Sequence, residues 1–487
     1  MYHSNDCGRA LNYLSATELV ELYRRKEASP VEVMTDYIQQ YNKVNPSLNA
    51  FSFTFFEQAL AKASKAEQAY ASGQAGALEG LAIAIKDETY IEGQETTNGS
   101  RLLQGDVATS TDPVAERLIA AGGIVHGRTT TPEFSTAAVT WSDLWGVSRS
   151  PWNPEVTCGG SSGGSAIAVA SGMTAFANGT DIGGSVRIPA AFCGLYGYKP
   201  AHGWVPEIAP YNIDPYCHHG LLARTLDDIQ LGYQVIRGPH QGDLHSFVPR
   251  PQEADIVSLK DVKVGVSEDL GFYSVEQDVR RCLRQAVGEL TQAGVVATDI
   301  TLDWDEQVIE TAKVHQRANM GLYLAQRWNR PENRAHMTSY LRQYLDNAEA
   351  VTAKKILEAN LYLCHMWQSL SQVFAQHDVL ICPTLCTTQV PADFDYSRHQ
   401  IEVDGQIVDP NKGWFMTYPF NTLGQCPVLT MPVGECDNGI PGSVQIVGRP
   451  YQEQAVFAVA RQLSRTLSAD FYHTRFPAFD SITRAAV

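Results

Sequence analysis

The chain has 487 residues, of which 44% are hydrophobic and 18% are charged, and this composition is typical of a folded globular protein rather than a disordered one. Its formal net charge is -16, from 37 basic and 53 acidic side chains. The averaged surface field therefore repels phosphate backbones and anionic membranes. We expect neither nucleic acid nor a membrane as a partner.

The ten cysteines are dispersed along the chain, unlike those of a small disulfide-bonded domain, and this predicts reduced, mostly buried thiols. Cys382 and Cys386 form the one close pair, but Pro383 lies between them and no second pair is near, so no zinc site is predicted. Residues 1–14 lack a basic segment followed by an apolar one, and no run of 18 apolar residues occurs. We expect a cytoplasmic protein without a metal or another cofactor.

Two helices are predicted near the start of the chain. Ser15 is followed three residues later by Glu18, and Ser29 is followed by Pro30 and Glu32. In this pattern the serine caps the helix and the carboxylate three residues on bonds back to the capping residue. Both serines therefore predict helix N-termini.

A strand and a helix-to-strand unit follow. Residues 81–85 form a short apolar run, which predicts a buried strand that ends just before Lys86. Asp112 starts a predicted helix that runs to Ala121, and two glycines end it before a strand at residues 124–125. This alternation is typical of α/β proteins.

The alternation recurs in the second half of the chain, at residues 262–266, 275–293 with 295–296, and 378–382. We therefore predict an α/β fold in which a mixed β-sheet core is covered by helices on both faces. Residues 304–376 are polar-rich and lack strand patterns, which predicts a helical cap or insertion. Because no repeat or linker divides the chain, we expect one domain over 1–487, with its core at about 70–230.

The segment 158–194 is the richest in glycine and serine. A flexible linker has such a composition, but the apolar residues inside this segment argue against one. A phosphate-binding loop needs a lysine after its last glycine, and the sequence has no Gly-Lys pair. Residues 159–163 formally match the G-x-S-x-G elbow of α/β-hydrolases, which would make Ser161 the nucleophile. The elbow requires a preceding strand, however, and Pro151 and Pro154 stand there instead.

Three motifs resemble the amidase signature family: GGSSGGS at Gly159–Ser165, GTDIGGSVRIPAAFCG at Gly179–Gly194, and AIKD at Ala84–Asp87. Further similarities are SPVEV from Ser29, TPEF from Thr131 and VQIVGRP from Val444, so the resemblance spans nearly the whole chain. It implies the amidase signature fold and the hydrolysis of amides.

The resemblance implies three catalytic residues. Ser185 is the expected nucleophile, Ser161 bridges it to the base, and Lys86 accepts the proton through Ser161. A serine hydroxyl is a weak nucleophile until a base removes its proton, and a buried lysine can act as that base only when it is neutral. Apolar neighbours on the predicted strand, such as Ile83 and Ile85, favour the neutral form.

The same resemblance implies how the two serines are held. The Gly160-Ser161 peptide bond is expected to be cis. An oxyanion hole is expected from four backbone N–H groups, because glycines let such donors approach the developing charge. These groups belong to Ile182, Gly183, Gly184 and Ser185.

Three further residues have supporting roles, each with a simpler alternative. Asp181 and Arg187 flank the nucleophile and either pair to brace its loop or remain solvated. Ser162 resembles a family position that supports proton traffic, but a hydroxyl in a glycine-rich loop can also serve only to satisfy backbone groups.

The sequence departs from the family on the substrate side. Many relatives have an Asp-His-Val-Gly-Pro type stretch where this chain has residues 214–220, DPYCHHG, so the rim of the acyl pocket differs. His218 and His219 would point apart on a strand and have no acidic neighbour in sequence, so we expect a structural or rim role. Candidate pocket walls, in a protein whose aromatic residues are mostly core, are Trp204, Tyr211, Tyr216, Cys217, Trp414, Phe415 and Tyr418.

Three functions remain open. The first is hydrolysis of a small-molecule carboxamide to an acid and ammonia or an amine through an acyl-enzyme, with ester cleavage as a further reaction. The second is the amidase subunit of a tRNA-dependent glutamyl/aspartyl amidotransferase, which works with partner subunits. The third, a non-catalytic binding protein on the same scaffold, is disfavoured because all three chemical residues are present. A homodimer is one candidate assembly for such an enzyme.

Overall fold

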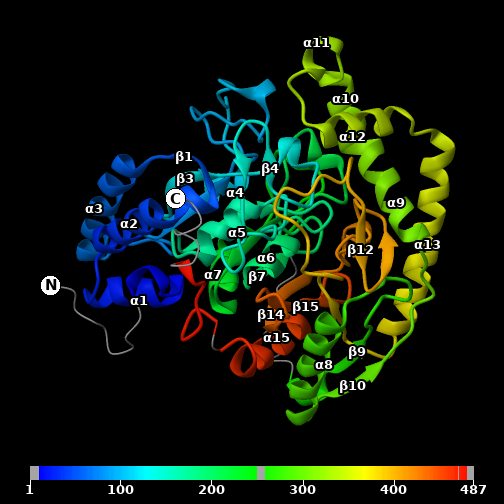
Figure 1. The fold of residues 1–487 in the computed structure, drawn as a ribbon. Helices are drawn as coiled ribbons and strands as arrows, with labels where there is room; N and C mark the ends of the chain where they lie inside the picture. The colour runs from blue at the N-terminus through cyan, green and yellow to red at the C-terminus, as the bar shows by residue number, and fades with distance from the viewer. Residues whose placement is uncertain (1–9, 249–257, 470, 480–487) are drawn as a thin grey trace.

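The computed structural model describes residues 10–248, 258–469 and 471–479 (Figure 1). The first nine residues, with Cys7, lie outside this range, so the expectations that rest on them are not addressed. The nine described cysteines are all free, and each is buried except Cys364. Among the described residues, no helix combines the length and the apolar character that a membrane span requires.

A mixed sheet of 11 strands runs through the molecule in the order β1-β3-β2-β6-β8-β7-β14-β15-β11-β9-β10. β2 is parallel to β3 and β6, β9 is parallel to β10 and β11, and the other neighbours are antiparallel. The strands are β1 (Phe51–Thr54), β2 (Ala82–Lys86), β3 (Ile124–Thr129), β6 (Phe176–Thr180), β7 (Tyr196–Lys199), β8 (His219–Ala223), β9 (Lys263–Val266), β10 (Val296–Asp299), β11 (Val379–Pro383), β14 (Val428–Glu435) and β15 (Pro441–Gly448). Two small hairpins complete the strands: β4 (Trp141–Ser142) with β5 (Gly146–Val147), and β12 (Ile401–Val403) with β13 (Gln406–Val408).

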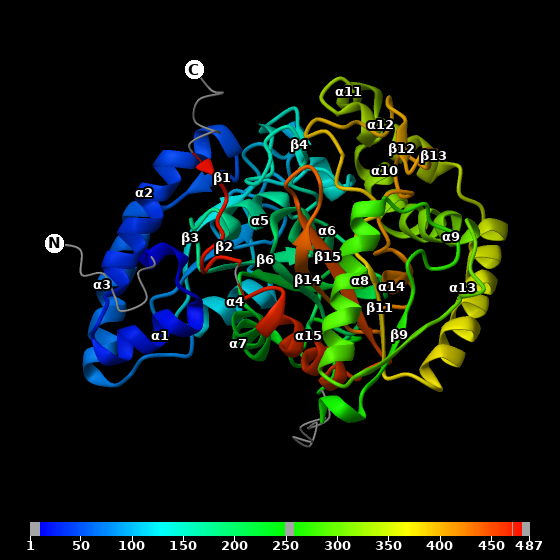
Figure 2. The same ribbon diagram turned by 60° about the horizontal axis from the view of Figure 1, so that its bottom comes forward.

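Helices cover both faces of the sheet, as predicted (Figure 2). Two neighbouring residues of β8 show the alternation: a Cβ on Gly220 would meet Val186, just before α6, whereas Leu221 faces Gly232 of α7. The helices of this part are α1 (Ala16–Arg25), α2 (Pro30–Leu48), α3 (Phe56–Ser72), α4 (Pro113–Ala120), α5 (Gly163–Ala170), α6 (Arg187–Cys193), α7 (Leu226–Ile236), α8 (Gln277–Gln292), α14 (Pro419–Thr422) and α15 (Gln454–Thr466). Short 3-10 turns are η1 (Leu11–Tyr13), η2 (Arg101–Leu103), η3 (Glu133–Ser135), η4 (Tyr211–Ile213) and η5 (Leu259–Asp261).

The predicted helix starts are confirmed. Ser15 Oγ accepts a hydrogen bond from the Glu18 N–H over 3.1 Å, and the Glu18 carboxylate accepts one from the Ser15 N–H over 2.8 Å. Ser29 and Glu32 form the same reciprocal pair at the start of α2. The predicted strand at 81–85 is β2, which also includes Lys86 as its last residue.

The segment 304–376 contains helices and no strand, as predicted. After a short loop come α9 (Gln307–Gln316), a π-helical turn η6 (Arg317–Gly321), α10 (Leu322–Trp328), α11 (Pro331–Arg334), α12 (Ser339–Glu349) and α13 (Ala353–Phe374). α9 and α13 pack against each other beyond one end of the sheet, and α10 to α12 continue from them along the same side of the molecule (Figure 1). This arrangement places the turn η6 and α10 next to the residues described below.

Candidate active site

Lys86 ends β2 and is fully buried. Its backbone N–H donates to Asn178 Oδ1 on β6 over 2.8 Å, which ties the strand end to its neighbour. Its Nζ lies 2.7 Å from Ser161 Oγ, 2.7 Å from Thr180 Oγ1 and 2.6 Å from Glu88 Oε2. Burial lowers the pKa of Lys86, and Glu88 only partly opposes this effect. The amine is thereby shifted toward the neutral form that a base requires.

Ser161 follows a cis peptide bond, Gly160-Ser161, as the resemblance implies. The backbone is tightly enclosed here, because a Cβ on Gly160 would lie 2.7 Å from the backbone nitrogen of Val139. Upstream, residues 151–160 form turns and isolated bridges rather than a strand. Ser161 therefore lacks the strand-turn-helix setting of an α/β-hydrolase elbow.

Ser185 lies in the loop between β6 and α6 and is 7% exposed. Its carbonyl accepts a hydrogen bond from the Ser162 N–H over 3.1 Å, so the two serine-bearing loops are joined. Gly184 has a φ of +115°, and a Cβ there would lie 1.9 Å from Thr417 Oγ1. Only glycine fits this position of the loop.

The four N–H groups predicted for the oxyanion hole are not equivalent. The Gly184 N–H donates to Asp181 Oδ1 over 2.8 Å and is already engaged. Within the part of the chain that the structure describes, no backbone hydrogen bond uses the N–H groups of Ile182, Gly183 or Ser185. The N–H groups of Ile182, Gly183 and Ser185 are therefore the three predicted donors that remain available to an oxyanion.

Asp181 and Arg187 form a buried ion pair with hydrogen bonds of 2.9 and 3.0 Å. Arg187 also donates to the Thr417 carbonyl, Asn421 Oδ1 and Gln445 Oε1. Burial alone would raise the pKa of Asp181, but Arg187 and the hydrogen bonds outweigh it and hold this pKa well below its usual value. Of the two alternatives for this pair, the buried one is observed.

Ser162 is fully buried between the two loops. Its hydroxyl donates to the Thr180 carbonyl over 3.4 Å, and its N–H donates to the Ser185 carbonyl. These contacts match the simpler role, in which the residue satisfies backbone groups, and its role in proton traffic stays a prediction.

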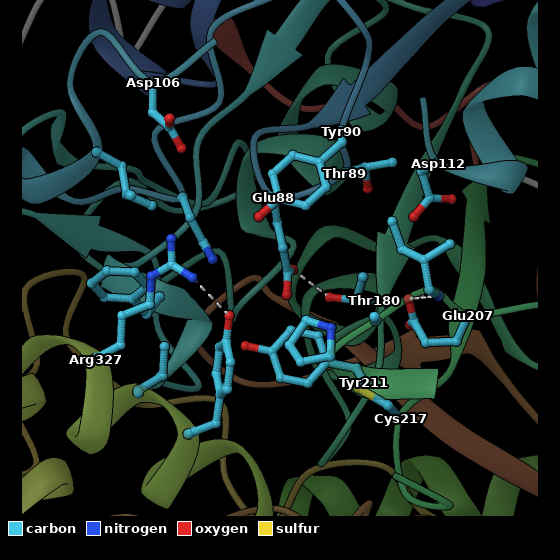
Figure 3. Close-up of a pocket in the computed structure, with 18 of the residues that line it drawn as sticks. Glu88, Thr89, Tyr90, Asp106, Asp112, Thr180, Glu207, Tyr211, Cys217 and Arg327 are labelled. Atoms are coloured by element: carbon cyan, nitrogen blue, oxygen red, sulfur yellow. Dashed lines mark hydrogen bonds between the residues drawn. The ribbon is translucent and has the colours of Figure 1, made fainter. Parts of the chain in front are cut away.

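Two pockets flank these residues. The first contains about 790 Å³ of space, part of it open to solvent, and Glu88 and Tyr211 point into it (Figure 3). Thr180 and Cys217 also line it, with the helical segment contributing Tyr323, Leu324, Arg327 and Trp328. The second contains about 330 Å³ and is lined by Ile182, Gly183, Ser185 and Tyr418, and by Met320 from η6. Tyr211 and Cys217 thus line the first pocket and Tyr418 the second, and their contact with substrate stays a prediction.

Comparison with known proteins agrees with this geometry. The family model described as Amidase matches residues 32–457. This protein belongs to the amidase signature family. An acylamidase of Rhodococcus erythropolis is 31% identical over 92% of this chain and 94% of its own length. A glutamyl-tRNA(Gln) amidotransferase subunit from a Cyanothece species is 30% identical over 95% of this chain and 99% of its own.

Two solved structures superimpose on nearly the whole chain. A bacterial aryl acylamidase belonging to the amidase signature enzymes superimposes with a TM-score of 0.87 at 26% identity, covering 95% of this chain and 98% of that one. The 6-aminohexanoate cyclic dimer hydrolase complexed with substrate gives a TM-score of 0.82 at 25% identity, covering 96% and 99%. The predicted fold is therefore confirmed.

Other residues predicted to line the substrate pocket do not line either of the two pockets. Trp414 and Phe415 are 1% and 0% exposed, pack edge to face with ring centroids 4.5 Å apart, and line neither pocket. Tyr216 stacks on His315 at 4.6 Å, and Trp204 is buried. Trp204, Trp414 and Phe415 are in the core because large rings gain most from burial there. Tyr216 is partly buried, and its ring packs on His315 instead of lining either pocket.

The fold gives His219 two acidic partners that its sequence neighbours do not suggest. Its Nε2 lies 3.4 Å from Asp112 Oδ2 and 3.3 Å from Glu207 Oε1. Burial lowers the pKa of His219, but the two carboxylates outweigh it and raise this pKa well above the usual value. The three groups have the composition of a metal site, with ligand atoms within 4.8 Å of one another, yet a protonated His219 already pairs with both carboxylates. His218 instead contacts backbone carbonyls, such as that of Gly424.

Sequence reasoning missed two residues that contact Lys86 Nζ, which are Glu88 and Thr180. Glu88 follows Lys86 by two positions and lies in the turn that begins where β2 ends, so its contact with Nζ depends on the direction of that turn. Thr180 comes from β6, beside β2 in the sheet. No local pattern predicts that pairing.

Proposed function

We propose that this amidase hydrolyses the C–N bond of a carboxamide through an acyl-enzyme on Ser185. The observation that carries the proposal is the buried Lys86 amine, 2.7 Å from Ser161 Oγ, with Ser161 on a loop hydrogen-bonded to that of Ser185. A lysine whose pKa is lowered by burial is suited to accept a proton through a hydroxyl at that distance.

The proposed reaction has two halves. Ser185 Oγ attacks the amide carbon while its proton passes through Ser161 to Lys86, and the N–H groups of Ile182, Gly183 and Ser185 stabilise the oxyanion. The C–N bond then breaks, and the proton held by Lys86 returns to the departing nitrogen, which leaves as ammonia or an amine. Water attacks the ester, again with loss of a proton toward Lys86, and the carboxylic acid is released as Ser185 recovers its proton.

A serine-directed fluorophosphonate tests this assignment against the alternative that Ser161 is the nucleophile. We expect mass spectrometry of the digested protein to locate the adduct on Ser185. Ser185→Ala should leave no adduct at either serine and no turnover of an amide panel, whereas Ser161→Ala should slow labelling without abolishing it. An adduct on Ser161 in the intact enzyme would contradict the proposal.

Several relatives are subunits of glutamyl-tRNA(Gln) amidotransferases, and this similarity supports a second candidate function. Under it, the same residues release ammonia from glutamine for use by partner subunits. The nearly equal identity to an acylamidase does not separate the two functions. Turnover of simple amides by the isolated chain favours the first, and glutaminase activity that appears only with partner subunits favours the second.

A further inference from the structure

The carboxylate of Glu88 lies at the centre of the hydrogen bonds around Lys86. Its Oε2 is 2.6 Å from Lys86 Nζ, and it accepts hydrogen bonds from Thr180 Oγ1 over 2.6 Å and from Ser135 Oγ over 3.0 Å. The side chain is 16% exposed and points into the larger pocket (Figure 3). Glu88 is thus fixed by three donors while one edge of it remains accessible.

The surroundings of Lys86 match the bonding capacity of a neutral amine. Such an amine has two N–H donors and one lone pair, and Nζ has three neighbours. Glu88 is ionised and can only accept, and Thr180 uses its own proton on Glu88, so these two take the N–H groups. The lone pair is left facing the hydroxyl of Ser161, from which a proton must come.

We propose that Glu88 is a positioning residue that orients the lone pair of Lys86 toward Ser161 and stabilises the ammonium formed when the proton arrives. This inference rests on the proposed amide hydrolysis. After transfer, Lys86 has three N–H donors and the same three neighbours, so no side chain has to move. An ionised carboxylate has this function beside the histidine of a serine protease triad, and Glu88 would have it here beside a lysine.

Among the charged and titratable groups around Lys86, Glu88 has the largest effect on the pH at which Lys86 loses its proton. Asp181 and Cys217 also face the amine, but Glu88 has the largest effect among the groups that raise the pKa of Lys86. In turn, burial raises the pKa of Glu88, and Lys86, Thr180 and Ser135 outweigh this and lower it. The lowered pKa of Glu88 favours its charged form beside Lys86.

The test is the second-order rate constant for phosphonylation of Ser185 as a function of pH, in the full-length wild type and in Glu88→Gln. The glutamine side chain should keep the shape of Glu88 but lack the negative charge that stabilises the Lys86 ammonium. In Glu88→Gln we expect the rate constant on the high-pH plateau to fall about a hundredfold. We also expect the half-maximal pH, at which the rate constant is half of its plateau value, to move lower, because the pKa of Lys86 falls when the neighbouring charge is removed. An unchanged half-maximal pH, or one moved higher, overturns the proposal.

Asp106→Asn is the matched control, because Asp106 lines the same pocket and is not among the groups that shift the pKa of Lys86. It should leave the half-maximal pH in place.

Glu88→Ala should regain part of its lost rate when formate is added, a recovery that a purely structural role would not produce. If Glu88→Gln melts early, Glu88→Asp replaces it, with a lower plateau and a retained half-maximal pH expected. Absence of labelling on wild-type Ser185 would instead contradict the proposed function itself.

Discussion

Three buried lysines in the described part of this protein have lowered pKa values, and of these only Lys86 contacts a proposed catalytic serine. Burial lowers the pKa of Lys86, which touches Ser161. Burial also lowers the pKa of Lys199 to about 7, but Lys199 donates to the backbone carbonyls of Gly424 and Cys426. Burial lowers the pKa of Lys412, which contacts Gln316 and Tyr418. Titration of any of the three lysines can therefore contribute to a pH profile, and substitution distinguishes them.

We predict that kcat/KM for an amide rises with pH to a plateau, because the base works only after Lys86 loses its proton. Lys86→Ala should remove this activity while circular dichroism stays close to wild type. Lys199→Met, as the control, should keep an acidic limb governed by Lys86. A wild-type rate that stays constant down to acidic pH would rule out Lys86 as the base.

The buried pair Asp181–Arg187 is predicted to stabilise the fold in a pH-dependent way. The pKa of Asp181 is lowered in the folded state, so its contribution is present above the unfolded-state pKa and is lost as pH falls toward the folded-state value. Asp181→Asn leaves Arg187 charged and buried, which should cost about 3–5 kcal/mol of unfolding free energy at neutral pH.

Urea denaturation at several pH values measures this loss, and the difference between Asp181→Asn and wild type should shrink in acid. Asp437→Asn provides the surface comparison, since Asp437 pairs with Arg281 where both side chains are more than half exposed. That variant should unfold like the wild type. Equal effects of the two substitutions would show that burial of the first pair has no energetic role.

At the scale of elements, two glycines differ in whether the backbone requires them. The loop from β6 to α6 requires Gly184, whereas α8 does not require Gly288. We predict that Gly184→Ala abolishes turnover, because the position has a φ of +115° and its Cβ would lie 1.9 Å from Thr417 Oγ1. Gly288→Ala in α8 meets no atom within 4 Å and should stabilise the protein by about 1 kcal/mol. Turnover and melting temperature of the two variants test this, and an active Gly184→Ala enzyme would contradict the account of the loop.

The elements that the sequence predicts are those whose ends are specified locally. Ser15 and Ser29 start helices through side chains three residues away, and the helix after Asp112 is capped in the same local way. In contrast, His219 meets its partners Asp112 and Glu207 only in the folded chain, where β8 holds His219 beside them. No short stretch of the sequence therefore reveals these three residues as a cluster.

The same distinction applies to the pocket residues. Tyr418 and Trp414 are aromatic, four positions apart and equally reasonable from sequence, yet one lines a pocket beside Ser185 and the other is core. Their difference depends on which way each ring points within the irregular segment 411–418. Composition and motif spacing contain no information on that direction.

At the scale of the whole molecule, the order of strands in the sheet differs strongly from their order in the chain. β14 and β15, from the C-terminal part, lie between β7 and β11, and they connect the N-terminal strands to β9 and β10. Predicting mixed α/β architecture needs only the alternation of elements, but this order depends on contacts between residues hundreds of positions apart.

We predict that the chain unfolds as one unit, because β14 and β15 join both halves of the sheet. Leu118→Ala in α4 and Leu283→Ala in α8 each remove a fully buried side chain, one from each half. Each should cost about 2–5 kcal/mol and shift a single calorimetric transition as a whole. Two transitions, of which each variant moves only one, would indicate two domains instead.

The partners of Arg187 have a consequence for how the protein is made. Its guanidinium binds acceptors at Thr417, Asn421 and Gln445, and the last of these is 258 positions farther along the chain. At about 5–20 residues per second, the ribosome adds Gln445 on the order of tens of seconds after Arg187. Throughout that interval the nascent chain has Arg187 and its ionic partner Asp181 but not these acceptors, and polar N–H groups without acceptors resist burial. We therefore expect the loop of Ser185 to become ordered only after β15 has been synthesised, so that the enzyme is inactive until that strand leaves the ribosome.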